Sequence, residues 1–366
     1  MIRTDIFDYA KAFRAYRDKT EDEKNGLAIH HHLLKSLQDQ GLLCADDRPA
    51  LVADIGCGEG DTIINCLKNL NFKAGIDIRA IDSNPRFIDD QTCWHDNGVV
   101  THQTSPVARN FSKAKELQII PLRNYRLKHG DMVQSNLASL LCTKEEMQQC
   151  RNRFDIVYFS HSMYYANQMV KNGQFGVTSL LDQVFNDLLS DNGMAILIHN
   201  NVISNSGMSI YAYSKYLIPN LNPSTEERQG ISVDCLIQNS CRELGLTYFE
   251  IPFKSAVYYS QQFLKYVDIF KDVNRFRELK DNEDAIQDLY RLMFSHHRPI
   301  DEDYDDPRGW KTEVDLIADI VKKQGCTNMY SSIHVVLGRN TSPEFKRKVE
   351  TAVKYALDKR PPSILY

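Results

Sequence analysis

The stretch "LVADIGCGEG" at residues 51–60 places a short apolar segment, an aspartate and three glycines in direct succession. An apolar run that ends at glycine predicts a buried strand. Residues 61–70, "DTIINCLKNL", have helical spacing and an acid in the first turn. Glycines between a strand and a helix let the backbone approach a ligand closely, and the first N–H groups of the helix have no partners within it. The segment therefore predicts a unit that cradles a ligand.

The next apolar segment, "GIDIRAID" at residues 75–82, predicts a second strand that ends in Asp82. A carboxylate at the end of this strand suits the two hydroxyls of a ribose. The sequence therefore indicates an adenosine-type cofactor. A glycine turn that binds no ligand is the alternative, and the ordered succession of strand, loop, helix and acid-ended strand argues against it.

The spacing of the glycines distinguishes between cofactors. Dinucleotide-binding loops read G-x-G-x-x-G, whereas here the third glycine, Gly60, comes one position early. Glu59 and Asp61 beside the loop disfavour a pyrophosphate and tolerate a cationic ligand, and Asp54 adds another carboxylate close by. An NAD-dependent oxidoreductase is therefore disfavoured.

The run "DIGCGEG" is similar to the glycine loop of class I S-adenosylmethionine-dependent methyltransferases, and the resemblance covers about residues 51–200. It implies S-adenosyl-L-methionine as the cofactor and an α/β, Rossmann-like sheet with helices on both faces. Within "KHGDM" (128–132), an aspartate falls where this fold often contacts the adenine, although a surface turn would equally explain it. The residues that the resemblance implies for cofactor binding are Asp54, Gly56, Gly58, Asp82, Asp131 and Ser160.

Further strands and helices alternate along the chain, which predicts parallel βαβ units. Expected strands include 153–160, 194–200, 247–253 and 331–339, and the segment 177–193 is expected to be an amphipathic helix. The expected divisions are an N-terminal helical cover (1–50), a methyltransferase core (51–253 and 331–340), a helical insertion or cap (254–330) and a C-terminal helical tail (341–366).

A narrower and more distant resemblance lies in "FRAYRDKTEDE" (13–23), "YFSHSMYYANQ" (158–168) and "NMYSSIHVVLGR" (328–339). These segments look like the corresponding parts of the histamine N-methyltransferase family. The resemblance implies that Glu21 contacts an amine, although a solvated acid in a charged run is the alternative. Histamine itself is in doubt as the substrate, because His161 stands where the family has a glutamine.

Three tyrosines complete the acceptor site that this resemblance implies. Tyr164 and Tyr165 match a tyrosine pair of the family, and Tyr330 falls near a family asparagine. A sulfonium can rest against an aromatic face, whereas packing into the core is the alternative for either member of the pair. His161 follows a predicted strand and could accept a proton from an amine or hydroxyl, because the pKa of histidine lies near working pH. It could instead hydrogen-bond a carboxylate or amide of the acceptor.

The composition limits the other classes of function. The 366 residues carry a net charge of -4, so nothing indicates broad attraction to nucleic acid or to an anionic membrane. Nine cysteines without a C-x-x-C pair suggest reduced thiols in a cytoplasmic compartment, and no ligand spacing indicates a metal. No stretch approaches the roughly 20 apolar residues of a membrane span.

These observations together predict an S-adenosylmethionine-dependent methyltransferase that acts on a small molecule, with a nitrogen of an amine or imidazole as the expected acceptor. A protein side-chain methyltransferase, a small-molecule carboxyl or O-methyltransferase, and a cofactor-binding scaffold without turnover are the alternatives. The scaffold has no physical need for both the glycine loop and Asp82.

Overall fold

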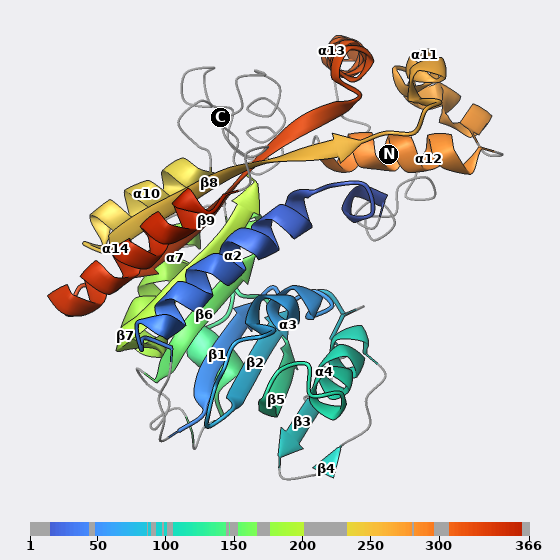
Figure 1. The fold of residues 1–366 in the computed structure, drawn as a ribbon. Coiled ribbons are helices and arrows are strands. Elements are labelled where there is room, and N and C mark those ends of the chain that lie inside the picture. The colour runs from blue at the N-terminus through green and yellow to red at the C-terminus, as the bar shows by residue number, and fades with distance from the viewer. Residues whose placement is uncertain are drawn as a thin grey trace.

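The computed structural model describes residues 15–43, 48–85, 87–88, 93–96, 99–100, 105–143, 146, 153–166, 176–200, 233–279, 282–295 and 307–360. The centre of the molecule is a nine-stranded sheet with the order β4-β3-β5-β2-β1-β6-β7-β9-β8 (Figure 1). Its strands are β1 (Ala50–Ile55), β2 (Ile76–Asp82), β3 (Cys93–Asp96), β4 (Val99–Val100), β5 (Leu122–His129), β6 (Phe154–Ser160), β7 (Leu189–Asn200), β8 (Thr247–Tyr258) and β9 (Cys326–Leu337).

The five central strands, β5, β2, β1, β6 and β7, are parallel, and the chain reverses its direction of travel across the sheet between β1 and β6. This order is that of a doubly wound sheet, in which ligands bind outside the carboxyl ends of the strands at the point of reversal. Strand β9 lies antiparallel between β7 and β8. The topology therefore places a binding edge beside β1 and β6.

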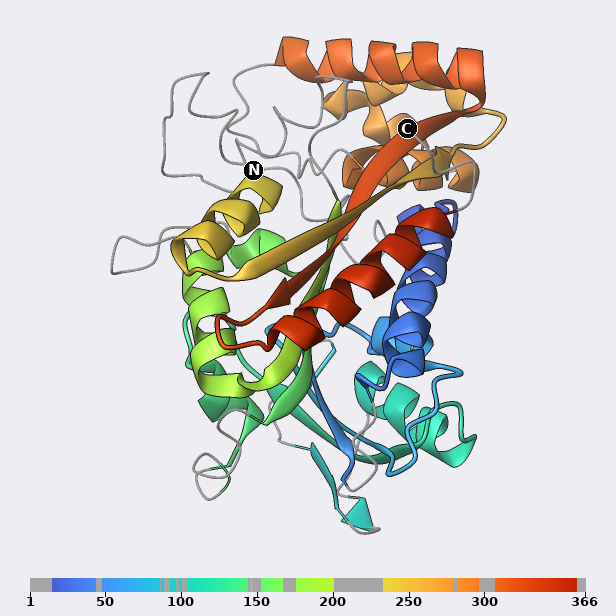
Figure 2. The ribbon, with the colours of Figure 1, turned by 60° about the vertical axis from the view of Figure 1, so that its left-hand side comes forward.

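Helices cover both faces of the sheet, because its central strands are apolar on both sides. One face carries α2 (Asp22–Asp39), α3 (Asp61–Leu67), α4 (Pro106–Glu116) and α14 (Pro343–Asp358). The other face carries α5 (Leu137–Leu141), α7 (Gly176–Gln183), the π-helix η2 (Val184–Leu188) and α10 (Val233–Glu243). Figure 2 shows α2 and α14 side by side across the sheet. The expected fold class, an α/β Rossmann-like sheet with helices on both faces, is confirmed.

Two boundaries differ from the sequence-based expectation. The helix expected over 177–193 ends at Leu188, and Leu189 already pairs with Phe154 of β6. The residues 254–258 and 326–330, expected within the helical insertion, belong to strands β8 and β9. These residues pair with each other beyond the end of β7, whose last partner in β9 is Ser331. Cross-strand pairing, which periodicity within one segment does not reveal, decides both boundaries.

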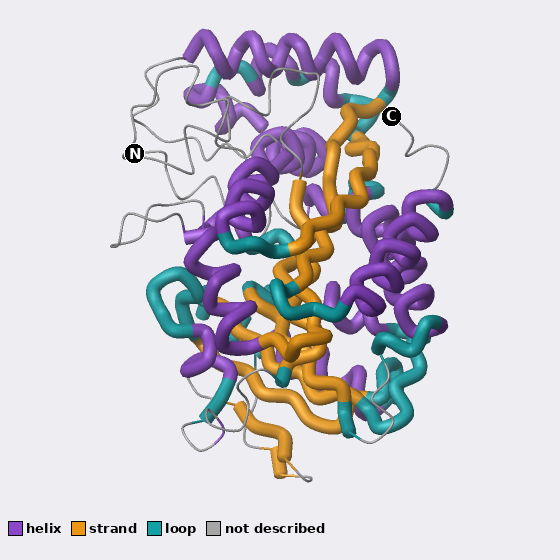
Figure 3. Tube along the Cα trace, turned by 90° about the vertical axis from the view of Figure 1, so that its left-hand side faces the viewer, coloured by secondary structure: helices purple, strands orange, loops and turns teal. Residues whose placement is uncertain are grey.

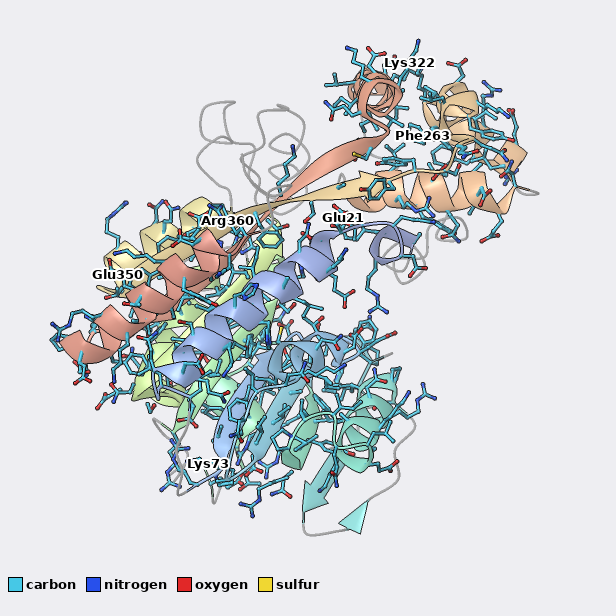
Figure 4. All side chains as sticks on the ribbon, in the orientation of Figure 1. Glu21, Lys73, Phe263, Lys322, Glu350 and Arg360 are labelled. Carbon is cyan, nitrogen blue, oxygen red and sulfur yellow. The ribbon has the colours of Figure 1, made fainter. Side chains whose placement is uncertain are left out.

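The β8–β9 ribbon carries a helical cap past the carboxyl edge of the parallel strands, as Figure 3 shows. The cap contains η3 (Phe263–Lys265), α11 (Val267–Phe270), η4 (Val273–Leu279), α12 (Glu283–Ser295) and α13 (Pro307–Gln324). It has an apolar cluster of its own, which includes Phe263 (Figure 4), Leu289 and Ile317. Arg291 joins the cap to the N-terminal segment, because its Nε donates to the carbonyl oxygen of Ala15 over 2.9 Å.

Candidate functional site

Several of the predicted site residues come together at the carboxyl edge of the parallel strands. The glycine loop follows β1, Asp82 ends β2, Asp131 follows β5, and His161 follows β6. Because these strands are parallel neighbours, their ends meet at one edge of the sheet. The fold thus assembles one site from segments that are far apart in the sequence.

Two glycines of the loop are required for different reasons. Gly56 and Gly58 both have a left-handed backbone, with φ of +74° and +55°. A Cβ at Gly56 would lie 2.3 Å from the Cβ of Ser162, whereas a Cβ at Gly58 would meet no atom of the described residues within 4 Å. Gly56 therefore permits packing inside the protein, and Gly58 leaves open space where a ligand could approach the backbone.

Ser162 is a residue of the site that the sequence analysis missed. It is buried, and its Oγ donates a hydrogen bond of 2.7 Å to the carbonyl oxygen of Ile55, just before the loop. The serine thereby holds the end of β1 against the segment that follows β6. The sequence contains no signal for this contact, because a serine after a strand has many possible partners.

Asp82 ties the glycine loop to the end of β2. One of its carboxylate oxygens accepts from the Gly58 N–H over 2.8 Å, and the other accepts from the Asn84 N–H over 2.8 Å. Burial raises the pKa of this carboxyl, and the two backbone donors offset part of that effect. Each carboxylate oxygen has two lone pairs, so Asp82 can accept a further hydrogen bond from a ligand.

The acids beside the loop have different surroundings. Asp61, the first residue of α3, accepts from Arg17 Nη1 over 2.6 Å, which also docks the N-terminal segment beside the loop. Asp54 in β1 is buried, and its Oδ1 has no hydrogen-bond partner within the described part of the chain. Burial raises the pKa of Asp54 to about 8, and the negative charges of Asp82 and Asp61 add to the effect. Asp54 is thus the carboxyl that a bound cation would stabilise in its ionised form.

Asp54 should make the protein less stable as the pH rises. Its pKa of about 8 lies above the ordinary value of 3.8, so between these values the folded chain binds more protons than the unfolded chain. The free energy of unfolding contributed by this group therefore falls from about pH 4 to about pH 8. We expect Asp54→Asn to reduce that decline, measured by urea denaturation at pH 5 and pH 8. The exposed Asp39→Asn on α2 is the control, and an unchanged decline in Asp54→Asn would contradict the prediction.

His161 stands at the bend that follows β6. Its φ of +53° is left-handed, which is uncommon outside glycine, although histidine is among the residues that adopt it. Its backbone N–H donates to the carbonyl oxygen of Ile198 in β7 over 2.7 Å, and 34 % of its side chain is exposed. The bend turns the side chain out of the strand at the edge where the glycine loop lies.

The surroundings keep the His161 imidazole neutral. The His161 side chain is only partly buried, and the desolvation that accompanies this lowers its pKa most; the Asp22 carboxylate acts in the opposite direction, and a positive charge on His199 would lower the pKa further. The net direction is downward from the ordinary value of 6.5. A neutral imidazole can accept a proton at physiological pH, so His161 is suited to act as a base.

Asp22, which the sequence analysis did not select, is the carboxylate that faces His161. Its Oδ2 lies 3.8 Å from His161 Nε2, and its Oδ1 accepts from Ser331 Oγ over 2.6 Å. Glu21 points elsewhere: its Oε1 accepts from Tyr258 Oη over 3.3 Å, at the end of α2 nearest the β8–β9 ribbon (Figure 4). A role for Glu21 in acceptor binding stays a prediction.

Helical spacing could have distinguished these two acids. Asp22 lies on the side of α2 that is buried, and the residues that share this side are Asn25, Gly26, Ile29, Leu33 and Leu37. The phase of the apolar residues therefore points Asp22 towards the protein interior. The same phase sets Glu21 at the margin of the buried side.

For the remaining predicted site residues, the structure gives contacts within the protein or no side-chain position. Asp131 Oδ1 accepts from the N–H groups of Val133 and Gln134 over 2.8 and 3.3 Å, so it stabilises its own turn. Ser160 is the last residue of β6 and pairs with Ile198. Contacts of both residues with a cofactor stay predictions. The side chains of the predicted acceptor tyrosines lie outside the described residues; these are Tyr164, Tyr165 and Tyr330.

Within the described residues, no group of three or more His, Cys, Asp or Glu side chains could hold a metal ion. In the same part of the chain, no helix is long and apolar enough to cross a membrane.

No protein-family model and no curated protein matches the sequence. Among solved structures, the chain is similar to the YcgJ protein from Bacillus subtilis, with 15 % identity, a TM-score of 0.40, and coverage of 85 % of this chain and 99 % of that one. Phosphoethanolamine N-methyltransferase 2 from Haemonchus contortus, in complex with S-adenosyl-L-methionine, matches at 12 % identity and a TM-score of 0.32, covering 80 % and 49 %. Geranyl diphosphate C-methyltransferase from Streptomyces coelicolor matches at 10 % identity and a TM-score of 0.33, covering 82 % and 78 %. Values this low assign no activity to the chain.

Proposed function

We propose that this chain is an S-adenosylmethionine-dependent methyltransferase that methylates a nitrogen of a small-molecule acceptor, such as an amine or an imidazole. The observation that carries the proposal is the presence of an open glycine loop and a neutral histidine at one edge of the sheet. Gly58 leaves open space beside the loop, Asp82 borders it, and His161 follows the neighbouring strand β6.

The residues around the loop fit this cofactor better than a dinucleotide. The Asp82 carboxylate can accept from a ribose hydroxyl while it keeps its bonds to the loop. The buried Asp54 carboxyl has an oxygen that lacks a partner among the described residues, and a positive charge near the loop would stabilise its ionised form, so it favours a ligand with a positive charge. When bound, S-adenosylmethionine would supply a methyl group activated by its sulfonium.

The positions of these residues at one edge of the sheet indicate how the protein would promote methyl transfer. A nitrogen nucleophile must present its lone pair, so a protonated amine has to lose a proton before it reacts. His161 is neutral and lies at the site, so it can accept that proton. The loop and the histidine hold the two reactants at one edge, which lowers the entropic cost of bringing them together.

The position of the cap supports a small acceptor. The β8–β9 ribbon carries the cap beyond the carboxyl edge, where it can cover a small pocket and exclude water. A protein side chain, a carboxyl group or a hydroxyl group as the acceptor are the other outcomes of the tests. The more distant resemblance to histamine N-methyltransferases favours nitrogen.

Calorimetry with S-adenosylhomocysteine and with NAD tests the cofactor directly. We expect binding of S-adenosylhomocysteine and not of NAD. Asp82→Ala should weaken the binding by about 1–3 kcal/mol, because it removes a charge-assisted hydrogen-bond partner. Asp77→Ala, at the opposite end of β2, is the matched control. Unchanged affinity in Asp82→Ala would mean that the cofactor does not reach this strand.

Methyl transfer to a panel of small amines and imidazoles, followed by formation of S-adenosylhomocysteine, tests the acceptor class. Turnover with at least one nitrogen compound is the expected result. Turnover with carboxylic acids, alcohols or intact proteins alone would replace the nitrogen acceptor with one of those classes.

A further inference from the structure

The buried Asp22 carboxylate is built into the site by three elements. It is the first residue of α2 and is 4 % exposed. The hydroxyl of Ser331 in β9 donates to its Oδ1 over 2.6 Å, and its backbone N–H donates to Thr20 Oγ1 over 3.1 Å. Burying a carboxylate is costly unless it is hydrogen-bonded or paired, so this degree of burial requires compensating partners.

The second oxygen of Asp22 faces the histidine of the site. Its Oδ2 lies 3.8 Å from His161 Nε2, which is close enough for a strong interaction once the imidazole becomes positively charged. Catalytic contacts are often long in the absence of substrate and shorten when it binds. A carboxylate next to one nitrogen favours the tautomer with the proton on that nitrogen, and the other nitrogen is then unprotonated.

We propose that Asp22 is the positioning residue of His161: it holds the neutral imidazole in the Nε2–H tautomer, makes Nδ1 the proton-accepting atom, and stabilises the imidazolium that forms. The catalytic part of this inference rests on the proposed function. In the step itself, the acceptor N–H bond breaks, its proton forms a bond to His161 Nδ1, and the nitrogen keeps the electron pair. As this pair forms the bond to the methyl group, the bond between the methyl group and the cofactor sulfur would break and the sulfur would take its electrons.

A second titratable group that acts on His161 lies on the neighbouring strand β7. His199 of β7 is fully buried, and its Nε2 lies 3.2 Å from Nε2 of His334, with the two rings stacked. Tyr248 bridges His334 Nδ1 and the Glu250 carboxylate over 2.6 and 3.2 Å. A charge on His199 would oppose a charge on His161, so Asp22 is the group that favours the imidazolium.

The position of Asp22 also depends on the docking of the N-terminal segment. The backbone N–H of Glu21 donates to the Ala256 carbonyl oxygen over 2.9 Å, and Thr20 forms a bridge with Val257 of β8. These bonds fix the start of α2 against the ribbon that carries the cap. The basicity of His161 is therefore linked to an intact contact between the N-terminal segment and the β8–β9 ribbon.

Nuclear magnetic resonance of histidine-labelled full-length protein tests this inference without any acceptor. The tautomer and the pKa of His161 are read from the imidazole nitrogen and carbon signals, which are assigned with His161→Gln. We expect the Nε2–H tautomer in the unmodified chain and a lower pKa of His161 in Asp22→Asn, because the favourable charge is lost. Glu23→Gln, the next acid along α2, is the matched control and should change neither.

Kinetic measurements then distinguish a positioning role of Asp22 from a role in stability alone. With an amine that the chain methylates, Asp22→Asn should lower kcat by at least about tenfold, which is a part of the 10²–10⁴-fold that general-base catalysis supplies, and should leave the affinity for S-adenosylhomocysteine unchanged. If Asp22→Asn does not fold, Ser331→Ala should show a smaller effect in the same direction on the pKa of His161. An Nδ1–H tautomer, or an unchanged pKa of His161 in these variants, would overturn the inference. Absence of turnover with any amine, together with the expected pKa change, would instead reject the proposed function.

Discussion

His161→Ala is expected to lower kcat by about 10²–10⁴-fold, the range that a general base contributes, with little change in the affinity for S-adenosylhomocysteine. The imidazole at the end of β6, whose pKa is lowered, is the group that we propose accepts the proton of a nitrogen acceptor. Its loss removes that proton transfer and leaves the glycine loop and Asp82 intact. Steady-state kinetics with a methylated amine, and calorimetry with S-adenosylhomocysteine, measure the two effects separately.

The backbone at His161 requires a second variant. Its φ of +53° is left-handed, and alanine tolerates this region less well than asparagine does. His161→Asn keeps the bend and removes the base, so both variants should lose the same catalytic factor. His32→Ala, on the face of α2 that meets Tyr355, is the matched control for loss of an imidazole. Full activity in His161→Asn would show that His161 accepts no proton.

Gly58→Val is expected to abolish the binding of S-adenosylhomocysteine while the chain remains folded. A Cβ at Gly58 would project into space where no atom of the described part of the chain lies within 4 Å, which is where the ligand is expected to approach. A β-branched side chain at a φ of +55° also strains the loop, so the N–H that donates to Asp82 would shift. Calorimetry measures the binding, and circular dichroism checks the fold.

Gly41→Val is a close control for this substitution. Gly41 also has a positive φ, of +74°, and also has nothing within 4 Å of an added Cβ, but it lies at the end of α2 away from the glycine loop. It should therefore suffer a similar backbone strain and retain binding. If Gly58→Val bound S-adenosylhomocysteine normally, the cofactor would have to lie elsewhere on the chain.

Local pattern determined the elements that make the cofactor loop. The apolar run 51–55, the glycines and the helix from Asp61 could be predicted because each depends on the properties of neighbouring residues, namely burial, backbone freedom and spacing. Asp82 could be predicted at the end of the next strand for the same reason. Parallel neighbours then bring these ends to one edge of the sheet.

Pairing between distant segments decided the boundaries that the sequence analysis missed. Leu189 is strand because it meets Phe154, although the local spacing continues to look helical. Residues 254–258 are strand because 326–330 lie beside them. Such pairing energies belong to two segments at once, so neither segment alone reveals them.

The tertiary structure alone decided which side chains meet at the site. Ser162 packs against Gly56, and Asp22 rather than Glu21 faces His161. The first contact depends on the pairing of β1 with β6, and the second depends on the docking of α2 beside the end of β6. Sequence alone determined the chemistry that was available, the loop, the acids and the histidine, because this depends on residue type. The fold selected the carboxylate beside the histidine, because electrostatic coupling depends on distance and burial.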